Sequence, residues 1–216
     1  MNQPSAYHLQ GDMLRVLLAG LGCRAAWLPL DDRLLDRDTA IRQLAILVQS
    51  GAVQNDGSSL QIELPLRIWL AAIADAPWAV RFFAPGAFYF QGCLYPADGQ
   101  AVCLLASGAE QLRLCALPRT GLWQALCELE PALDLPDAPP GALGAPLPVS
   151  AEHIPLPGEA LRLQRYKAGG GGPEQAAAVY GPGYYLFGAG AGLQASPWRA
   201  ADAQALLEHW LWREEP

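Results

Sequence analysis

The chain has 216 residues and a mass of 23.1 kDa, which is long enough for one large domain or two small ones. Its net charge is −7, its pI is near 4.9 and it has no cluster of lysine or arginine, which argues against binding to nucleic acids or to anionic membranes. Hydrophobic residues make up 52% of the chain and charged residues only 16%, so either the core is unusually large or apolar surface is kept for a partner.

Residues 1–77 are predicted to contain three helices and a hairpin. The first helix follows Asp12 as its N-cap, and the second spans 38–50 with Asp38 as its N-cap. The turn Asn55-Asp-Gly-Ser lies between two short extended runs and is a strong hairpin signal. A third amphipathic helix completes the unit. The order of helix, loop, helix and hairpin resembles a winged helix, so we predict a winged-helix-like subdomain here.

The candidate recognition helix of this winged helix is the segment 38–50. It offers Arg42, Gln43 and Gln49 to a partner, but also Asp38. Residues 1–76 carry six arginines against eight acidic residues, a balance that favours packing or protein contact over binding to DNA. A winged-helix regulator that senses a ligand or a partner stays open as an alternative function.

From Trp78 onward the hydrophobic period changes from near 3.6 to two. This change predicts four strands, joined by short turns with glycine or proline and followed by a helix over 119–129. The strands are expected at 79–84, 87–95, 101–107 and 111–117. Residues 78–130 are therefore predicted to form an antiparallel meander with one helix.

Residues 131–157 contain eight prolines and little periodicity, which is typical of a linker. Residues 158–216 again contain extended segments followed by one helix, for which Ser196 is the predicted N-cap. The expected strands lie at 160–167, 175–180, 183–188 and 191–195. The chain thus has two similar units on either side of the linker.

An internal similarity supports two equivalent units. Shifting the chain by 80 residues places 102–130 over 182–210 with seven identities in 29 positions, among them Gln124 with Gln204 and Glu128 with Glu208. Chance similarity in an alanine-rich chain is the alternative explanation. The predicted fold is therefore α+β: an antiparallel sheet with a pseudo-twofold strand–helix repeat and the N-terminal winged-helix-like subdomain.

No motif for catalysis, metal binding or phosphate binding is present. The chain has no GxSxG sequence, and its glycine-rich segments lack the Gly-Lys-Ser/Thr ending of a phosphate loop. The three histidines lie in separate predicted segments, at His8, His153 and His209. We expect no enzymatic activity, no cofactor and no metal. The remaining alternative is an enzyme whose pocket converges on Arg199, Asp202 and Tyr184.

The cysteines indicate a reducing compartment. They lie at Cys23, Cys93, Cys103, Cys115 and Cys127. Their odd number and the lack of any CxxC pair predict buried thiols rather than disulfides or a zinc site. The N-terminus is polar without a basic region, and its most apolar stretch is interrupted by arginines and a proline. We therefore expect a cytoplasmic protein without a signal peptide or a membrane-spanning helix.

The predicted strands are apolar on both faces, as in Phe88-Tyr-Phe-Gln-Gly-Cys-Leu-Tyr. An antiparallel sheet with one solvated face should instead alternate. Either helices cover both faces of the sheet, or one face is left for a partner, where tyrosine is a favoured contact residue. The second interpretation names Phe88, Tyr89, Tyr95, Tyr184 and Tyr185 as the contact residues.

A family resemblance lies in Leu14-Arg-Val-Leu-Leu-Ala-Gly-Leu-Gly, in Leu44-Ala-Ile-Leu-Val-Gln-Ser-Gly-Ala-Val, in 66–76, and in the strand-then-helix units ending at Leu129 and Leu211. This hydrophobic pattern covers most of the chain and resembles the EspG-type proteins of type VII secretion systems. The resemblance implies a pseudo-twofold antiparallel sheet with helical subdomains. It also implies a cytosolic chaperone for helical secreted proteins, although this chain is shorter than typical members.

The leading hypothesis is accordingly a noncatalytic, protein-binding adaptor or chaperone-like protein. The resemblance implies a helical secreted protein as its partner, and it carries over no individual binding residue. Self-association into a homo-oligomer stays open.

Overall fold

The computed structural model describes residues 6–23, 35–84, 90–107, 111–138, 159–168, 173–180, 184–188 and 194–213. The helical subdomain comes first, with β1 (Tyr7–Gln10), α1 (Gly11–Gly20), α2 (Arg37–Gln49), β2 (Val53–Asn55), β3 (Leu60–Ile62) and α3 (Leu64–Asp75). The first strand-and-helix unit has β4 (Trp78–Ala84), β5 (Phe90–Ala97), β6 (Gln100–Ser107), β7 (Gln111–Pro118) and α4 (Leu122–Leu129). The second unit has β8 (Glu159–Lys167), β9 (Pro173–Tyr180), β10 (Tyr184–Gly188), β11 (Gln194–Ser196) and α5 (Ala200–Trp212).

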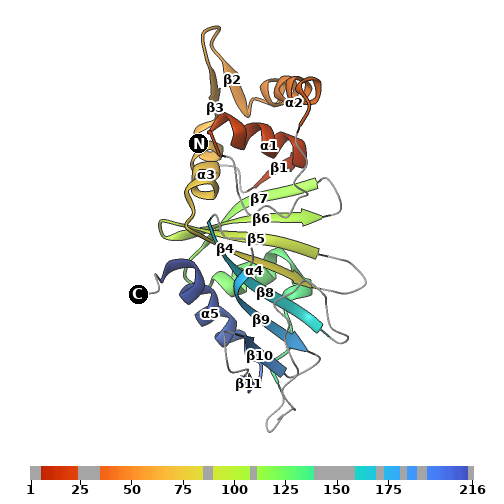
Figure 1. The fold of residues 1–216 in the computed structure, drawn as a ribbon, viewed down its shortest axis with the longest axis vertical. Coiled ribbons are helices and arrows are strands. Elements are labelled where there is room, and N and C mark those ends of the chain that lie inside the picture. Colours follow the sequence, from red (N-terminus) through yellow and green to blue (C-terminus); the bar gives the residue numbers. More distant parts are fainter. Residues whose placement is uncertain are drawn as a thin grey trace.

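Nine of the described strands form one antiparallel sheet in the order β1-β7-β6-β5-β4-β8-β9-β10-β11, as Figure 1 shows. The two meanders therefore run outward from a central β4–β8 pair. This architecture confirms the predicted α+β class with a large antiparallel sheet. Of the predicted linker at 131–157, the start forms a short 3-10 helix, η1 (Pro131–Leu133), and the part from 139 onward lies outside the described residues.

Each unit ends in the same order of elements, with β6, β7 and α4 in the first and β10, β11 and α5 in the second. The helices α4 and α5 pack against each other, and Gln204 of α5 joins them. Its side-chain oxygen accepts a hydrogen bond from the Trp123 backbone N–H at 2.7 Å, and its side-chain nitrogen donates to the Arg119 carbonyl at 3.2 Å. The order of elements agrees with an 80-residue repeat, while a true duplication stays a prediction.

Helices cover both faces of the sheet over the first unit. On one face Cys103 and Leu105 belong to a core that α4 and α5 cover. On the other face Val102 and Leu104 belong to a second core, beneath α1 and α3. Apolar residues on both faces of β6 therefore reflect a doubly covered sheet in this part of the protein, the first of the two interpretations above.

Two predicted helix starts in the helical subdomain are wrong. The N-cap of α2 is Asp36, whose side chain accepts the backbone N–H of Thr39 at 2.8 Å; Asp38 lies inside the first turn. The carboxylate of Asp12 makes no cap for α1. It lies in the first turn, where it forms an ion pair with Arg15 at 2.9 Å. Both errors shift a boundary by two residues. At the start of α2 the sequence offers Asp36 and Asp38 as equally good caps, whereas the N-cap residue of α1 is Gln10, without a side-chain cap.

The predicted cap of the last helix is also wrong, for a different reason. Ser196 ends β11, and α5 begins after Arg199. The backbone N–H of Ala200 donates to the carboxylate of Asp137 at 2.9 Å. A residue 63 positions away thus supplies the acceptor that a local N-cap would have supplied.

The edge strand β1 was not predicted. It pairs with β7, with Tyr7 opposite Leu114. The Tyr7 ring packs edge-to-face on Trp69 of α3 at a centroid distance of 5.4 Å, and its hydroxyl donates to Glu63 at 3.2 Å. Burial, together with the Glu63 carboxylate, raises the pKa of Tyr7 to about 12, so the hydroxyl keeps its proton. These contacts tie the helical subdomain to the sheet.

Gly92 lies in the middle of β5, opposite Phe82 on β4 and Leu105 on β6. A methyl group added there would lie 2.5 Å from the Phe82 ring and 2.9 Å from the Leu104 carbonyl oxygen. We expect Gly92→Ala to lower the free energy of unfolding by about 1–3 kcal/mol, because the packed core must shift to admit the methyl group. Urea unfolding measures this loss. Gly20→Ala, where nothing lies within 4 Å of the added methyl, is the control, and equal effects of the two changes would contradict the prediction.

The strand β8 carries an ion pair in the interior. Its apolar residues Leu161 and Leu163 face the core under α4 and α5, and Arg162 and Gln164 point the other way, as the alternation predicts. Arg162 and Glu159 are nevertheless fully buried at their side chains. The guanidinium Nε of Arg162 donates to the Glu159 carboxylate at 2.6 Å, and Nη2 donates to its second oxygen. Burial of this pair is what the sequence pattern could not indicate.

Candidate protein-binding surface

The aromatic contact residues named from the sequence do not form a described surface. Phe88 and Tyr89 lie outside the described residues. Tyr184 and Tyr185 begin β10, where their backbones pair with β9, and their side chains are likewise not described. Tyr95 is only 1% exposed and belongs to the core beneath α1 and α3. Its ring is therefore a core residue and cannot contact a partner in this structure.

Exposed apolar side chains gather elsewhere, in the helical subdomain. Among the described residues, five large hydrophobic side chains stand out as exposed, with between 38% and 60% of each accessible. We call them the exposed apolar set: Ile41, Ile46, Leu60, Leu64 and Ile68. All five lie in α2, β3 and α3 within 28 consecutive residues, so the helical subdomain carries every one of them.

The helix α3 contributes two of these side chains, Leu64 and Ile68. They lie one turn apart on the same side of the helix. The opposite side is also apolar, since Leu66 and Leu70 are fully buried against the sheet. An ordinary surface helix has one apolar stripe that faces the core and a polar outer face. The second, outward stripe of α3 is therefore apolar surface that this structure leaves exposed.

The hairpin β2–β3 holds Leu60 in a fixed position. One oxygen of the Asp56 carboxylate accepts the backbone N–H groups of Ser58 and Ser59, at 2.8 and 2.7 Å, and its other oxygen accepts the Ser59 hydroxyl at 3.0 Å. The hydroxyl and backbone hydrogen bonds of Ser58 are the largest causes that hold the pKa of Asp56 well below its ordinary value. The carboxylate thus stays ionised and keeps the turn closed at neutral pH.

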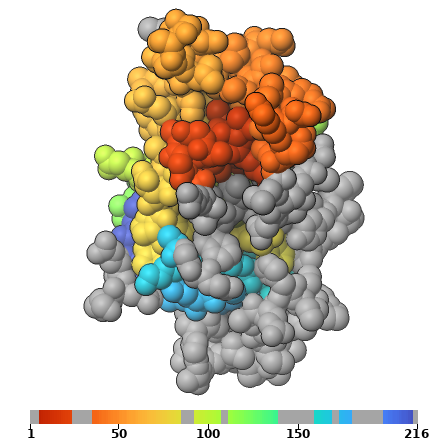
Figure 2. Space-filling view, turned by 45° about the horizontal axis from the view of Figure 1, so that its top comes forward, coloured from red at the N-terminus to blue at the C-terminus, as the bar shows by residue number. Residues whose placement is uncertain are grey.

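The helix α2 contributes Ile41 and Ile46. Its buried side carries Leu47 and Gln43, and the Gln43 amide donates to the side chain of Gln10 at 3.3 Å. Gln43, one of the three side chains that the predicted recognition helix was expected to offer to a partner, therefore faces inward instead. Figure 2 shows α2, in orange, beside the hairpin at one end of the molecule, and α2 packs on β2. The helix α2 thus carries two exposed isoleucines, five residues apart, and packs beside the hairpin.

The described cysteines are free, and most have weakly acidic thiols. Burial raises the pKa of Cys93 to about 12 and that of Cys127 to about 11. Burial also raises the pKa of Cys103, whereas the hydrogen bond from Cys103 lowers that of its cross-strand neighbour Cys115. Thiols with raised pKa values are poor nucleophiles, which suits the core role predicted for them.

Two alternatives, a metal site and an enzyme pocket, can be followed in the part of the chain that the structure describes. That part contains no group of three or more histidine, cysteine, aspartate or glutamate side chains that could hold a metal ion. Arg199 and Asp202, named for an enzyme pocket, are both exposed around the start of α5. None of the described helices is long and apolar enough to cross a membrane.

Comparison with known proteins identifies the fold. No protein-family model matches the sequence, and no curated protein matches it either. Among solved structures, the chain is similar to the Mycobacterium tuberculosis type VII secretion system chaperone EspG5, solved in complex with a PE25-PPE41 dimer. The TM-score is 0.61 at 11% sequence identity, over 97% of this chain and 98% of that chain. The chain therefore has an EspG-like fold, as the hydrophobic pattern of the sequence implied.

Proposed function

We propose that this protein is a noncatalytic, chaperone-like protein that binds a protein partner through the exposed apolar set of α2, β3 and α3. The observation that carries the proposal is the outward stripe of Leu64 and Ile68 on a helix whose other side is already buried. The fold supports it, because EspG5 is a secretion chaperone solved with a protein dimer. Exposed apolar side chains are typical of a site for another protein. The net charge of −7 argues against a site for nucleic acid, which needs positive charge.

The partner that fits this surface best is an amphipathic helix. Leu64 and Ile68 form a ridge with a spacing of four residues, and such a ridge packs into the groove of a second helix. Leu60, which the closed hairpin turn holds near the start of α3, would flank that helix. We therefore propose a helical secreted protein as the partner, met in the cytoplasm and linked to type VII secretion. The EspG-like fold and the family resemblance in the sequence both support this finer proposal.

Two aspartates placed on the outward stripe should abolish partner binding without unfolding the protein. We expect Leu64→Asp with Ile68→Asp to weaken the complex by about 100-fold or more, because each apolar side chain contributes about 1.5–3 kcal/mol when buried and aspartate resists burial. The free energy of unfolding should change little, since both positions are exposed. Affinity purification from the native host followed by mass spectrometry would identify the partner, and calorimetry with that purified partner would measure the affinity.

The matched control is Ala201→Asp with Ala205→Asp. These two alanines are exposed and lie one turn apart on α5, outside the helical subdomain, so they repeat the charge change at the same spacing. The control should bind like the unmodified protein. Equal binding by the Leu64/Ile68 variant, or recovery of DNA in place of a protein, would defeat the proposal.

A further inference from the structure

The helix α3, which carries the outward stripe, begins without a side-chain cap of its own. Its N-cap residue is Glu63, whose carboxylate makes no hydrogen bond to the first turn of the helix. In that turn Pro65 has no backbone N–H, so the N–H groups of Leu64 and Leu66 remain without an acceptor inside the helix. Leu66 is fully buried, and a buried N–H that neither water nor the helix can satisfy needs an acceptor from elsewhere in the fold.

That acceptor comes from the edge of the sheet. The hydroxyl oxygen of Tyr7, in β1, accepts a hydrogen bond from the backbone N–H of Leu66. The same hydroxyl donates its proton to the Glu63 carboxylate at 3.2 Å. An N-cap side chain usually accepts this N–H directly. Here Tyr7, 56 positions before Glu63 in the chain, stands between the N-cap carboxylate and the first turn of the helix.

The ring of Tyr7 also fixes the rotation of α3 about its axis. It packs edge-to-face on the Trp69 ring, with the centroids 5.4 Å apart. Glu63, Leu66 and Trp69 follow one another at intervals of three residues, so they line one side of α3, which faces β1 and the sheet. The outward stripe lies on the other side of the same turns. Contacts on the inward side therefore decide where the outward stripe points.

We propose that Tyr7 is a positioning residue for the partner site: its hydroxyl is the N-terminal cap of α3, and it holds the first turn, with the outward stripe, in a fixed orientation on the sheet. The effect on partner binding rests on the proposed function, whereas the capping itself does not. A turn that is ordered before binding loses little conformational entropy in the complex. Because Tyr7 contacts the inward side of α3, it acts on binding without touching the partner.

Tyr7→Phe tests the proposal, because it keeps the ring on Trp69 and removes only the hydroxyl. Amide hydrogen exchange, followed by NMR spectroscopy, should become about fivefold faster or more at Leu66 and Ile68, as the loss of a helix cap of ordinary strength predicts. Exchange at Leu163, in β8, should stay within about twofold, because loss of a cap opens only the turn that it holds. Urea unfolding checks that the variant remains folded.

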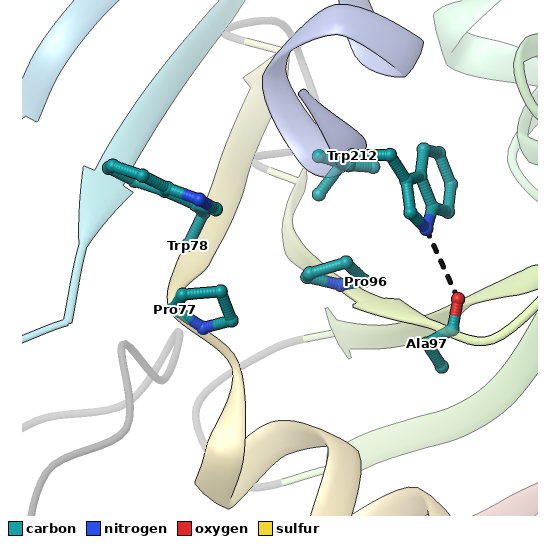
Figure 3. Close-up of a pocket in the computed structure, with 6 residues that line it drawn as sticks. Pro77, Trp78, Pro96, Ala97 and Trp212 are labelled. Atoms are coloured by element: carbon teal, nitrogen blue, oxygen red, sulfur yellow. Dashed lines mark hydrogen bonds between the residues drawn. The ribbon is translucent and has the colours of Figure 1, made fainter. Parts of the chain in front are cut away.

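Trp212→Phe is the matched control, since it also keeps an aromatic ring and removes one hydrogen-bonding group. The Trp212 indole N–H, at the end of α5, donates to the Ala97 carbonyl, at the end of β5, at 3.1 Å (Figure 3, dashed line). The control thus removes a tie between another helix and the sheet, outside the helical subdomain. It should speed up exchange at the end of α5 and leave exchange at Leu66 unchanged.

Glu63→Gln provides the rescue by a conservative change. The glutamine amide keeps an oxygen that can accept the Tyr7 hydroxyl proton, so the hydroxyl oxygen stays in place for the Leu66 N–H. Exchange at Leu66 should therefore change much less in Glu63→Gln than in Tyr7→Phe. If the two variants were equally damaging, the cap would be the Glu63 charge and not the Tyr7 hydroxyl, and the proposal would be wrong.

The outcome for Tyr7→Phe decides the rest. Unchanged exchange at Leu66, or a rise of the same size at Leu163, would overturn the role of Tyr7 as a cap. Calorimetry with the purified partner should show a complex weakened about threefold or more by Tyr7→Phe, since binding must then order the first turn. Faster exchange with unaltered affinity would overturn the positioning role. A failure of the proposed function would appear separately, as unaltered binding by the Leu64→Asp with Ile68→Asp variant.

Discussion

Replacement of Glu159 by glutamine is expected to lower the free energy of unfolding by about 3–5 kcal/mol, because Arg162 would remain charged in the core without this carboxylate. Both side chains have no exposed area, and the guanidinium donates two hydrogen bonds to the carboxylate. Urea unfolding followed by circular dichroism would measure the loss.

Two controls separate burial of the charge from loss of the hydrogen bonds. The double replacement Glu159→Leu with Arg162→Met removes both charges of the pair and should cost less than the single change, since neither partner is left buried without the other. Asp12→Asn breaks an ion pair of the same spacing, Asp12–Arg15, whose side chains keep 18% and 13% of their exposed area. It should cost less than about 1 kcal/mol. A loss below 1 kcal/mol for Glu159→Gln would show that the pair does not need both charges.

Trp198→Ala should be about as damaging, with an expected loss of about 3–5 kcal/mol. Trp198 is fully buried ahead of α5 and packs edge-to-face on Trp123 of α4, with ring centroids 5.7 Å apart. Its indole N–H donates to the Leu135 carbonyl at 3.4 Å. Removal of the ring therefore leaves a cavity between the last helix, α4 and the segment after η1, which the surrounding structure can fill only in part.

The control for this change is Trp198→Phe, which keeps an aromatic ring but loses the indole N–H. It should retain most of the stability, with a loss clearly smaller than that of the alanine variant. Urea unfolding measures both variants, and near-ultraviolet circular dichroism reports whether the aromatic packing with Trp123 is lost. A loss below about 2 kcal/mol for Trp198→Ala would mean that this part of the core collapses around the missing ring.

The sequence predicted those helices and strands whose signals lie within a few consecutive residues. The Asp-Gly turn at 56–57 marks the hairpin, and the alternation of Leu161 and Leu163 with Arg162 marks a strand face. Long-range pairing was not predictable. The ladder between β4 and β8 joins residues that are 79 to 89 positions apart, and nothing in either strand specifies the other.

The candidate site was harder to predict for the same reason. Alternation placed Tyr95 on one face of a strand, but it could not show that α1 and α3 cover that face. Leu64 and Ile68 could have been recognised as a second stripe, because they lie on the side of α3 away from Leu66 and Leu70. A sequence with both stripes also fits a fully buried helix, so only the position of α3 at the edge of the molecule decides between the two (Figure 1).

The junction at the centre of the sheet has a consequence for how the protein comes apart. Of the described strand pairs, only β4 with β8 links the two units, yet the core under α4 and α5 draws on both, for example through Val80 and Leu161. Unfolding of either unit would expose core residues of the other to water, so the two units are expected to unfold together as one cooperative unit. The core beneath α1 and α3 is shared between the helical subdomain and the first unit, for example through Leu14 and Leu104, and none of its described members comes from the second unit. Opening of the helical subdomain is therefore expected to expose part of the first unit, while the core under α4 and α5 stays in place, so this end of the protein has its own threshold for local unfolding.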